Sequence, residues 1–212
     1  MGMFKGYIFD LDGVVCHTDK FHYSAWKKIS DDLGIKFSEN INNLLRGVSR
    51  KESLEIILSF SDKKISDAEK EKIIKSKNDL YVKSLEKINK DFLDDGVEEV
   101  LRNLKEKNKK VALASSSKNA KLILNKLEII SYFTIIIDGN NITYSKPNPE
   151  IFEKAVSSLG LDKSDCLVIE DADSGIKAAK IAGIKVCGLG NNFTEEVNYK
   201  LNHIKELFKL ID

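Results

Sequence analysis

The chain has 212 residues, of which 42% are hydrophobic, enough for one sizeable core or for a core domain with a small insertion. Its 34 lysines and arginines nearly balance 33 aspartates and glutamates, so it lacks the basic surface that is typical of a nucleic-acid-binding protein. No apolar run is long enough to cross a bilayer and the N-terminus lacks the layout of a signal peptide, which predicts a cytoplasmic protein without a membrane partner.

The first predicted element is a short buried strand over residues 6–9, which ends in Asp10, Asp12 and Gly13. Its aromatic and β-branched residues are typical of a strand, and Gly13 marks the turn out of it. In open α/β sheets ligands bind beyond the carboxyl ends of the strands, so both aspartates are placed for chemistry. The same D-x-D-G pattern also occurs in acidic turns and in calcium loops, and alone it does not decide between these alternatives.

Residues 16–88 have the pattern of an all-helical insertion. Apolar residues recur at helical spacing in its first helix, for which Thr18 or Asp19 can be the cap. Two further helices are predicted to begin after Ser49 and Ser66, because each serine has a glutamate three residues later and so forms a capping box.

Three polar residues of this insertion, His22, Arg50 and Lys77, allow both a structural and a functional interpretation. A histidine beside an apolar stripe is more often a packing or surface residue, and a lysine on such a stripe usually extends its ammonium to solvent. Arg50 falls in a first helical turn, where a cation opposes the helix dipole, and this favours a functional reason for its presence.

After the insertion, helices and apolar strands alternate, which predicts a parallel sheet. Strands are predicted over 110–114, 134–137, 166–169 and 184–187, and helices over 97–104, 122–127, 148–160 (with Asn148 as cap and Pro149 in the first turn) and 174–182. We therefore predict an α/β fold with a Rossmann-like, doubly wound parallel sheet core, residues 1–15 and 89–212, and an inserted all-helical cap domain, residues 16–88. The cysteines Cys16, Cys166 and Cys187 are far apart without a C-x-x-C pair, so we expect free thiols.

Polar side chains follow the predicted strands at one edge of this sheet. Ser115 follows the second strand, Lys146 lies on the loop after the third, and Glu170 and Asp171 follow the fourth. Because the carboxyl ends of parallel strands converge, we expect these residues beside the two aspartates of the first strand. The carboxylates can hold Mg²⁺, the lysine and serine can bind phosphoryl oxygens, and one carboxylate is left to act as nucleophile.

In order and context, these residues resemble the four motifs of the haloacid dehalogenase-like superfamily of phosphotransferases. The matching motifs are Asp10-Leu11-Asp12-Gly13, Ser115, Lys146-Pro147, and Glu170-Asp171 followed by Ser174-Gly175-Ile176. Each motif alone is weak, but all four occur in order on the expected strands and loops. The helical insertion is similar to the smaller cap of this family.

Within the superfamily the chain is most similar to the β-phosphoglucomutases, and the segments that carry this likeness are 22–27, 47–50, 77–83 and 112–119. The resemblance implies a Mg²⁺-dependent isomerase that interconverts β-glucose 1-phosphate and glucose 6-phosphate. The reaction would pass through an aspartyl-phosphate and glucose 1,6-bisphosphate. The expected partner is a small sugar phosphate, and the expected assembly is a monomer.

The resemblance also implies a role for each matched residue. Asp10 would be the nucleophile and Asp12 the general acid and base, while Ser115 and Lys146 would hold the transferring phosphoryl group. The Mg²⁺ ligands would be Asp10, Asp12 (through its backbone carbonyl), Glu170 and Asp171. The substrate would be bound by His22, Trp26, Gly47, Arg50, Lys77, Ser116, Ser117, Lys118 and Asn119.

The chain departs from the family pattern where Ala172-Asp173 replaces a serine-containing pair, which puts a hydroxyl contact there in doubt but not the metal. Cys16 and His17 are also unusual beside the first motif, and we assign them no role. Two alternatives remain open at this point. One is a sugar-phosphate phosphatase of the same fold, which the core motifs do not separate from a mutase, and the other is an inactive domain kept as a binding module.

Overall fold

The computed structural model describes residues 4–191 and 193–211, and its strands form one parallel sheet in the order β3-β2-β1-β4-β5-β6. The strands are β1 (Gly6–Phe9), β2 (Lys110–Ala114), β3 (Ile135–Ile137), β4 (Cys166–Glu170), β5 (Lys185–Leu189) and β6 (Tyr199–Leu201). The chain winds outward from β1 in both directions, because β1 pairs with β2 on one side and with β4 on the other. This confirms the doubly wound sheet, and it creates a switch point beside β1.

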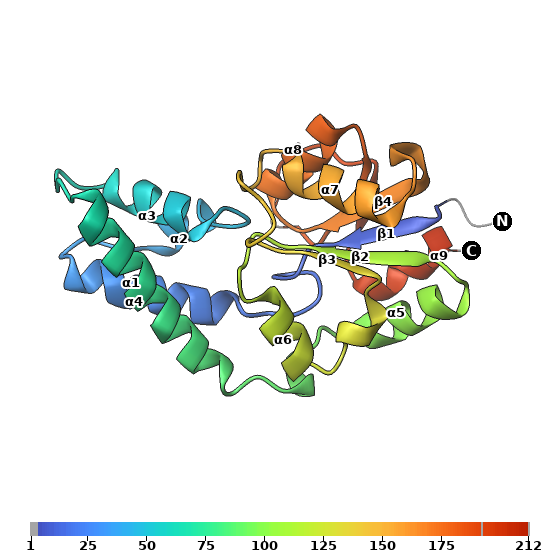
Figure 1. Ribbon diagram of the computed structural model, residues 1–212, viewed down its shortest axis with the longest axis horizontal. Helices are drawn as coiled ribbons and strands as arrows, with labels where there is room; N and C mark the ends of the chain where they lie inside the picture. Colours follow the sequence, from blue (N-terminus) through green and yellow to red (C-terminus); the bar gives the residue numbers. More distant parts are fainter. Residues whose placement is uncertain (1–3, 192, 212) are drawn as a thin grey trace.

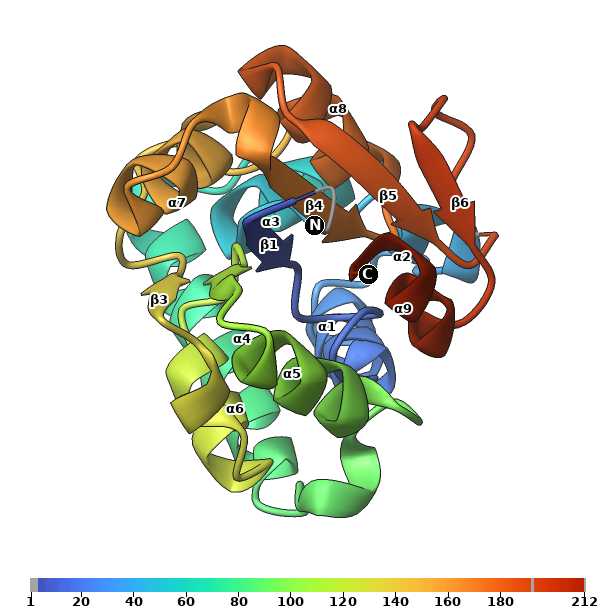
Figure 2. The ribbon, with the colours of Figure 1, turned by 90° about the vertical axis from the view of Figure 1, so that its right-hand side faces the viewer.

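Helices cover both faces of the sheet and also form a separate group beyond its carboxyl edge (Figure 1). The α-helices are α1 (Asp19–Asp32), α2 (Glu39–Asn43), α3 (Arg50–Leu58), α4 (Asp67–Leu85), α5 (Val97–Glu106), α6 (Ala120–Lys126), α7 (Glu150–Leu159), α8 (Asp173–Ala182) and α9 (Phe208–Ile211). Short 3₁₀ turns lie at Lys90–Phe92, Ile130–Tyr132, Lys163–Asp165 and Ile204–Leu207. Figure 2 shows α7 and α8 above the sheet and α5 and α9 below it.

Both faces of the central strands are buried. Tyr7 and Phe9 pack on the side of α5 and α6, whereas Ile8 packs with α7 and α8 on the other side. Successive side chains of a strand point to opposite faces, so a strand covered on both faces must be apolar at every position. Polar residues can therefore enter only where the strand ends, and that constraint places Asp10 at the edge of the sheet.

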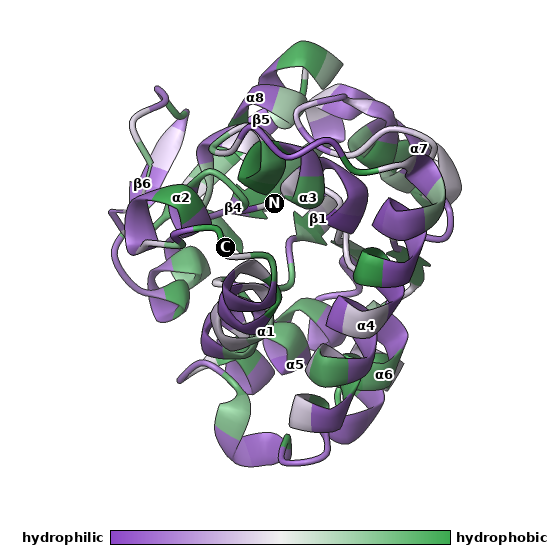
Figure 3. Ribbon diagram, turned by 90° about the vertical axis from the view of Figure 1, so that its left-hand side faces the viewer, coloured by the Kyte–Doolittle hydropathy of each residue, from purple (hydrophilic) through white to green (hydrophobic). Residues whose placement is uncertain are grey.

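A third hydrophobic cluster holds α1 and α3 together away from the sheet, and it is formed by Trp26, Ile29, Ile35, Phe37, Leu45, Leu54, Ile57 and Leu58. Tyr81 and Leu85, near the C-terminal end of α4, pack into the hydrophobic cluster of the sheet and not into this third cluster. Figure 3 shows hydrophobic and hydrophilic segments alternating along α4 and α6, as expected for helices with one buried face. The separate cluster supports the division into a core (1–15 and 89–212) and a cap (16–88), which remains our proposal.

Short elements and helix starts differ from the sequence-based expectations. The helix α2, the strand β6 and the helix α9 were not predicted, because they are short and mix polar with apolar residues. The prediction for Asn148 and Pro149 was wrong by one position: Pro149 is the N-cap of α7, and the Asn148 side chain accepts a hydrogen bond from the Glu150 amide at 3.0 Å. Thr18 is the N-cap of α1 by position, but its side chain makes no capping hydrogen bond.

Two other expectations can be compared with the structure. The three cysteines are buried free thiols, as predicted. Within residues 4–191 and 193–211, no helix is both long and apolar enough to span a membrane.

Leu54 tests whether residues 16–88 form a separate folding unit, because it is fully buried in the third cluster. Leu54→Ala would leave a cavity, and such changes cost about 2–5 kcal/mol. We expect faster amide hydrogen exchange in α1 and α3, with little change in β1 and β4. Equal loss of protection in the sheet would show that both parts unfold together and would contradict the division.

Candidate active site at the carboxyl edge of the sheet

The polar residues that follow the strands converge on a cavity of about 350 Å³ between the sheet and the helical insertion. Its lining includes the predicted residues Asp10, Asp12, His22, Trp26, Gly47, Arg50, Lys77, Ser115, Ser116, Ser117, Lys118, Glu170 and Asp171. Lys146 lies behind this lining, in contact with Asp10. Asn119 also lies outside the lining, and its side-chain amide donates to the side-chain oxygen Oδ1 of Asn78 at 3.0 Å.

Lys146 lies at the centre of a buried acidic cluster. Its Nζ is 2.5 Å from Asp10 Oδ1 and 2.7 Å from Glu170 Oε1, and it donates to the Ala114 carbonyl at 3.1 Å. The side chain is 0% exposed. Burial alone would lower the pKa of Lys146, but Asp10 and Glu170 outweigh it and raise the pKa above its ordinary value. The buried ammonium therefore stays charged. The Lys146–Pro147 peptide bond is cis.

Asp10, Glu170 and Asp171 each offer an oxygen atom within 4.8 Å of the others, and oxygen ligands are those that Mg²⁺ prefers. Backbone amides of Asp171 and Ala172 hold the second Glu170 oxygen at 2.7 and 3.0 Å. Gly13 has a φ of 91°, and a Cβ there would overlap the Asp171 carboxylate. These residues fit a divalent metal, because the donors converge and the glycine leaves them room.

The pKa of the Asp171 carboxyl group lies near physiological pH, so this group is only partly ionised there. Burial, together with Glu170, raises the pKa of Asp171 to about 7, although the neighbouring Arg46 lowers it. A cation bound at this cluster would favour the ionised carboxylate, because an opposite charge lowers the pKa of an acid.

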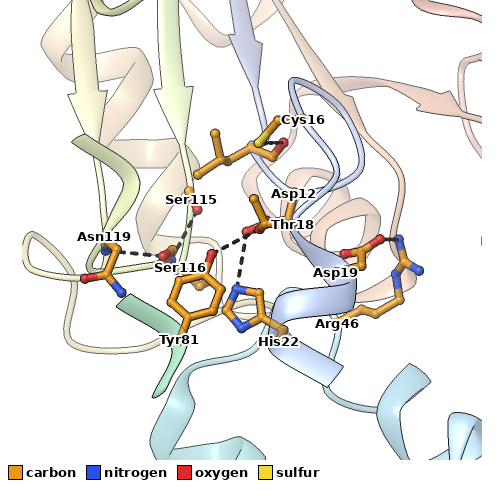
Figure 4. A network of polar contacts seen from close by, with 12 residues as sticks. Asp12, Cys16, Thr18, Asp19, His22, Arg46, Tyr81, Ser115, Ser116 and Asn119 are labelled. Atoms are coloured by element: carbon orange, nitrogen blue, oxygen red, sulfur yellow. Dashed lines mark hydrogen bonds and ion pairs between the residues drawn. The ribbon is translucent and has the colours of Figure 1, made fainter. Parts of the chain in front are cut away.

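The Asp12 carboxylate has different surroundings from those of Asp10, although only one residue separates them. It accepts a hydrogen bond from the Thr18 hydroxyl, which lies 3.0 Å from the Tyr81 hydroxyl, and Figure 4 shows Tyr81 beside Thr18 and Asp12. Because Thr18 uses its only proton on Asp12, Tyr81 is the donor to Thr18. Burial raises the pKa of Asp12 to about 6, even though the Thr18 hydrogen bond lowers it.

Lys77 is buried against aromatic side chains, so the interpretation that it extends its ammonium to solvent is wrong. It is 1% exposed, and its Nζ lies 5.1 Å from the Trp26 ring centroid, 4.8 Å from that of Tyr81 and 2.8 Å from His22 Nδ1. Burial and the charge of Arg50 lower the pKa of Lys77 to about 7. The sequence does not show whether the ammonium of Lys77 is buried or exposed, because a lysine with an apolar stem fits an apolar stripe in both cases.

His22 completes the contact between the helical insertion and Asp12. Burial, Lys77 and Arg50 lower the pKa of His22 well below its ordinary value, so its imidazole is neutral. With the Lys77 ammonium donating to Nδ1, the proton lies on Nε2, which is 3.9 Å from Asp12 Oδ2. The imidazole therefore presents a donor toward the carboxylate.

The loop after β2 is fixed by its own hydroxyl groups. The Ser117 amide donates to Ser115 Oγ at 3.2 Å, and the Asn119 amide donates to Ser117 Oγ at 3.2 Å. Ser116 donates to the Gly47 carbonyl at 2.7 Å and so joins this loop to the insertion. Arg50 begins α3 at the cavity wall, and none of the ion pairs among the described residues includes it.

Several residues of the site were not assigned a role from the sequence. Thr18 was considered only as a helix cap, and Tyr81 and Arg46 were given no role. Arg46 Nη2 is 2.5 Å from Asp171 Oδ2, a contact between residues 125 positions apart. No sequence pattern relates such distant residues, whereas Thr18 could have been noticed as a hydroxyl close to Asp12 in the sequence.

The comparisons with known proteins place this geometry in a family. A family model described as haloacid dehalogenase-like hydrolase matches residues 7–189. The chain belongs to this family. The match confirms the resemblance that the four motifs predicted. The known proteins that this chain is similar to include both a mutase and a phosphatase.

β-Phosphoglucomutase of Bacillus subtilis (strain 168) is 42% identical over 188 residues, which cover 88% of this chain and 83% of that protein. A phosphorylated carbohydrates phosphatase of Thermotoga maritima is 29% identical over 181 residues, covering 84% and 81%. The crystal structure of β-phosphoglucomutase from Clostridium difficile matches with a TM-score of 0.93 and 37% identity over 97% of this chain and 93% of that one. This structural match confirms the predicted fold.

The buried Lys77 predicts a pH-dependent stability. Its pKa is about 7 in the folded protein against the ordinary 10.5, so between these values the unfolded chain binds more protons and stability rises with pH. The free-energy cost of burying the charged Lys77 is fully present below about pH 7. We therefore expect Lys77→Met to stabilise the protein there by about 1–3 kcal/mol. The gain over wild type should shrink toward about pH 9.

Urea unfolding at several pH values measures this difference. Lys75→Met on the same helix is the matched control, because the Lys75 side chain is 80% exposed. A stability difference for Lys77→Met that does not change with pH would contradict the lowered pKa.

Proposed function

We propose that this chain is a Mg²⁺-dependent β-phosphoglucomutase, an isomerase that interconverts β-glucose 1-phosphate and glucose 6-phosphate. The observation that carries the proposal is the different placement of the two aspartates: Asp10 is paired with Lys146 inside the sheet, whereas Asp12 is bonded to Thr18 and faces His22. Two carboxyl groups in different surroundings are suited to different tasks. The 42% identity to the Bacillus subtilis mutase supports the same conclusion.

Asp10 would attack the phosphorus of the sugar phosphate, so that one Asp10 oxygen forms a bond to phosphorus and the sugar oxygen leaves. Asp12 would give that oxygen a proton, and it would take a proton from the next hydroxyl when the aspartyl-phosphate transfers its group back. Lys146 and the Ser115 hydroxyl would hold the phosphoryl oxygens. A Mg²⁺ ion bound by Asp10, Glu170 and Asp171, with the Asp12 carbonyl, would supply further positive charge for the anionic phosphoryl group.

A mutase must deliver the phosphoryl group to a sugar hydroxyl and keep it from water. The cap residues support this task, because Thr18, Tyr81 and His22 surround Asp12 from the helical insertion. An acid and base whose surroundings depend on the cap would be complete only when the cap is closed over a substrate. Trp26, Gly47 and Lys77 would form the wall on the cap side.

The second phosphate of the bisphosphate also needs a binding place. Arg50 is suited to it, because a guanidinium fork binds phosphate with two hydrogen bonds and Arg50 lines the cavity. Ser116, Ser117, Lys118 and Asn119 lie on the loop after β2 and would bind the same phosphate or the sugar.

A sugar-phosphate phosphatase is the second candidate, and the Thermotoga maritima relative favours it. The chemistry at Asp10 would be the same, with water as the acceptor. An inactive binding module is not favoured, because the buried set of Asp10, Lys146, Glu170 and Asp171 is intact.

A coupled assay with β-glucose 1-phosphate, Mg²⁺ and a trace of glucose 1,6-bisphosphate separates these functions. We expect glucose 6-phosphate to form without a matching release of inorganic phosphate. Asp10→Asn keeps the shape but removes the nucleophilic charge, so its activity should fall by at least about 10³-fold. Stoichiometric phosphate release by the wild type would favour the phosphatase, and near-normal turnover by Asp10→Asn would exclude Asp10 as the nucleophile.

Arg50 gives a second test of mutase against phosphatase. Loss of a charged, two-pronged phosphate contact by Arg50→Ala should lower transfer to the sugar by about 10- to 100-fold. Hydrolysis of the aspartyl-phosphate should change much less, since water needs no such contact, and Arg50→Lys should recover only part of the loss. Arg102→Ala on α5 is the control, because that side chain is 59% exposed. Equal losses in transfer and hydrolysis would argue that Arg50 serves cap folding instead.

A further inference from the structure

Arg46 bridges a candidate metal ligand and a second carboxylate. Its Nη2 lies 2.5 Å from Asp171 Oδ2 and 3.4 Å from Asp19 Oδ2. The Asp171 side chain is 5% exposed, whereas that of Asp19, in the first turn of α1, is 41% exposed. Figure 4 shows the Arg46 guanidinium facing Asp19 across the start of this helix. One arginine of the cap therefore has two carboxylates within reach.

The backbone at this arginine is held on the core independently of its side chain. Ser174 donates to the Arg46 carbonyl at 2.8 Å, and Ser116 donates to the next carbonyl, that of Gly47, at 2.7 Å. Gly47 has a φ of 74°, and a Cβ there would overlap the Ser174 hydroxyl. Because the backbone is fixed, the side chain of Arg46 can change partner while the loop stays in place.

The charges at the acidic cluster favour such a change when a metal binds. Three carboxylates, Asp10, Glu170 and Asp171, face two cations, Lys146 and Arg46, which leaves one formal negative charge. A divalent ion would turn this into an excess of positive charge at a buried place, which is costly. Lys146 is fully buried with three acceptors and is held there, whereas Arg46 is 22% exposed and has Asp19 beside it.

We propose that Arg46 is an internal competitor of the metal at Asp171 and that its guanidinium moves to Asp19 when Mg²⁺ binds. The inference rests on the proposed function for the identity of the metal site. It makes Arg46 a positioning residue, which neutralises Asp171 in the metal-free protein.

Calorimetric titration of Mg²⁺ into the metal-free, substrate-free protein tests the competition. Arg46→Gln should bind Mg²⁺ more tightly than wild type by at least about fivefold, the lower end of typical coupling between two sites. Arg102→Gln removes the same charge from an exposed position and should leave the affinity unchanged. Arg46→Lys keeps the charge without the fork and should fall between Arg46→Gln and wild type. Equal or weaker Mg²⁺ binding by Arg46→Gln, with its circular dichroism unchanged, would overturn the competition.

A double-mutant cycle tests the role of Asp19 as the second partner. Asp19→Asn should weaken Mg²⁺ binding to the wild type, because Arg46 then has no other carboxylate, but should have little effect in Arg46→Gln. Equal weakening in both backgrounds would show only the loss of a nearby negative charge, and would overturn the proposed movement. If neither wild type nor any variant bound Mg²⁺, the metal site of the proposed function would fail together with this inference. Identical affinities in all of them would overturn the inference alone.

Discussion

The ammonium of Lys146 connects three parts of the candidate site that come from different strands. It is bonded to Asp10 after β1, to Glu170 at the end of β4 and to the last carbonyl of β2, and it is shielded from water. Without this cation, two carboxylates would be buried side by side without a positive charge between them, which costs several kcal/mol. The acidic cluster and its fit to a metal both depend on this one side chain.

The fold supplies the rest of the arrangement through the apolar strands. Since β1 is covered on both faces, its first polar residue is Asp10, at the edge where β2 and β4 also end. The helical insertion covers the same edge and brings hydroxyl and imidazole groups to Asp12. The two aspartates thus obtain different surroundings, because one faces the sheet and the other the cap.

The sequence predicted the main helices from the helical spacing of their apolar residues and the central strands from their short apolar runs, and it predicted the acidic cluster because Asp10, Ser115 and Glu170 each mark a strand end. It did not predict the bond between Arg46 and Asp171, since no local pattern relates distant residues. It also favoured the wrong environment for Lys77, because a lysine with a long apolar stem has the same pattern whether it is buried or exposed. The roles of the site residues remain predictions, whereas the fold and the family are confirmed.

The position of β1 in the sheet has a consequence for how the chain folds during synthesis. This strand is made before the other five strands of the described sheet, but Gly6 pairs with Lys110 on one side and with Cys166 on the other. The cluster of α1 and α3 contains only residues made before either partner strand, so the insertion can collapse while β1 is still unpaired. Tyr7 also donates to the carbonyl of Leu210 at 2.8 Å, which ties the first strand to the last helix. Such pairings over long sequence separations make closure of the sheet a late and slow event.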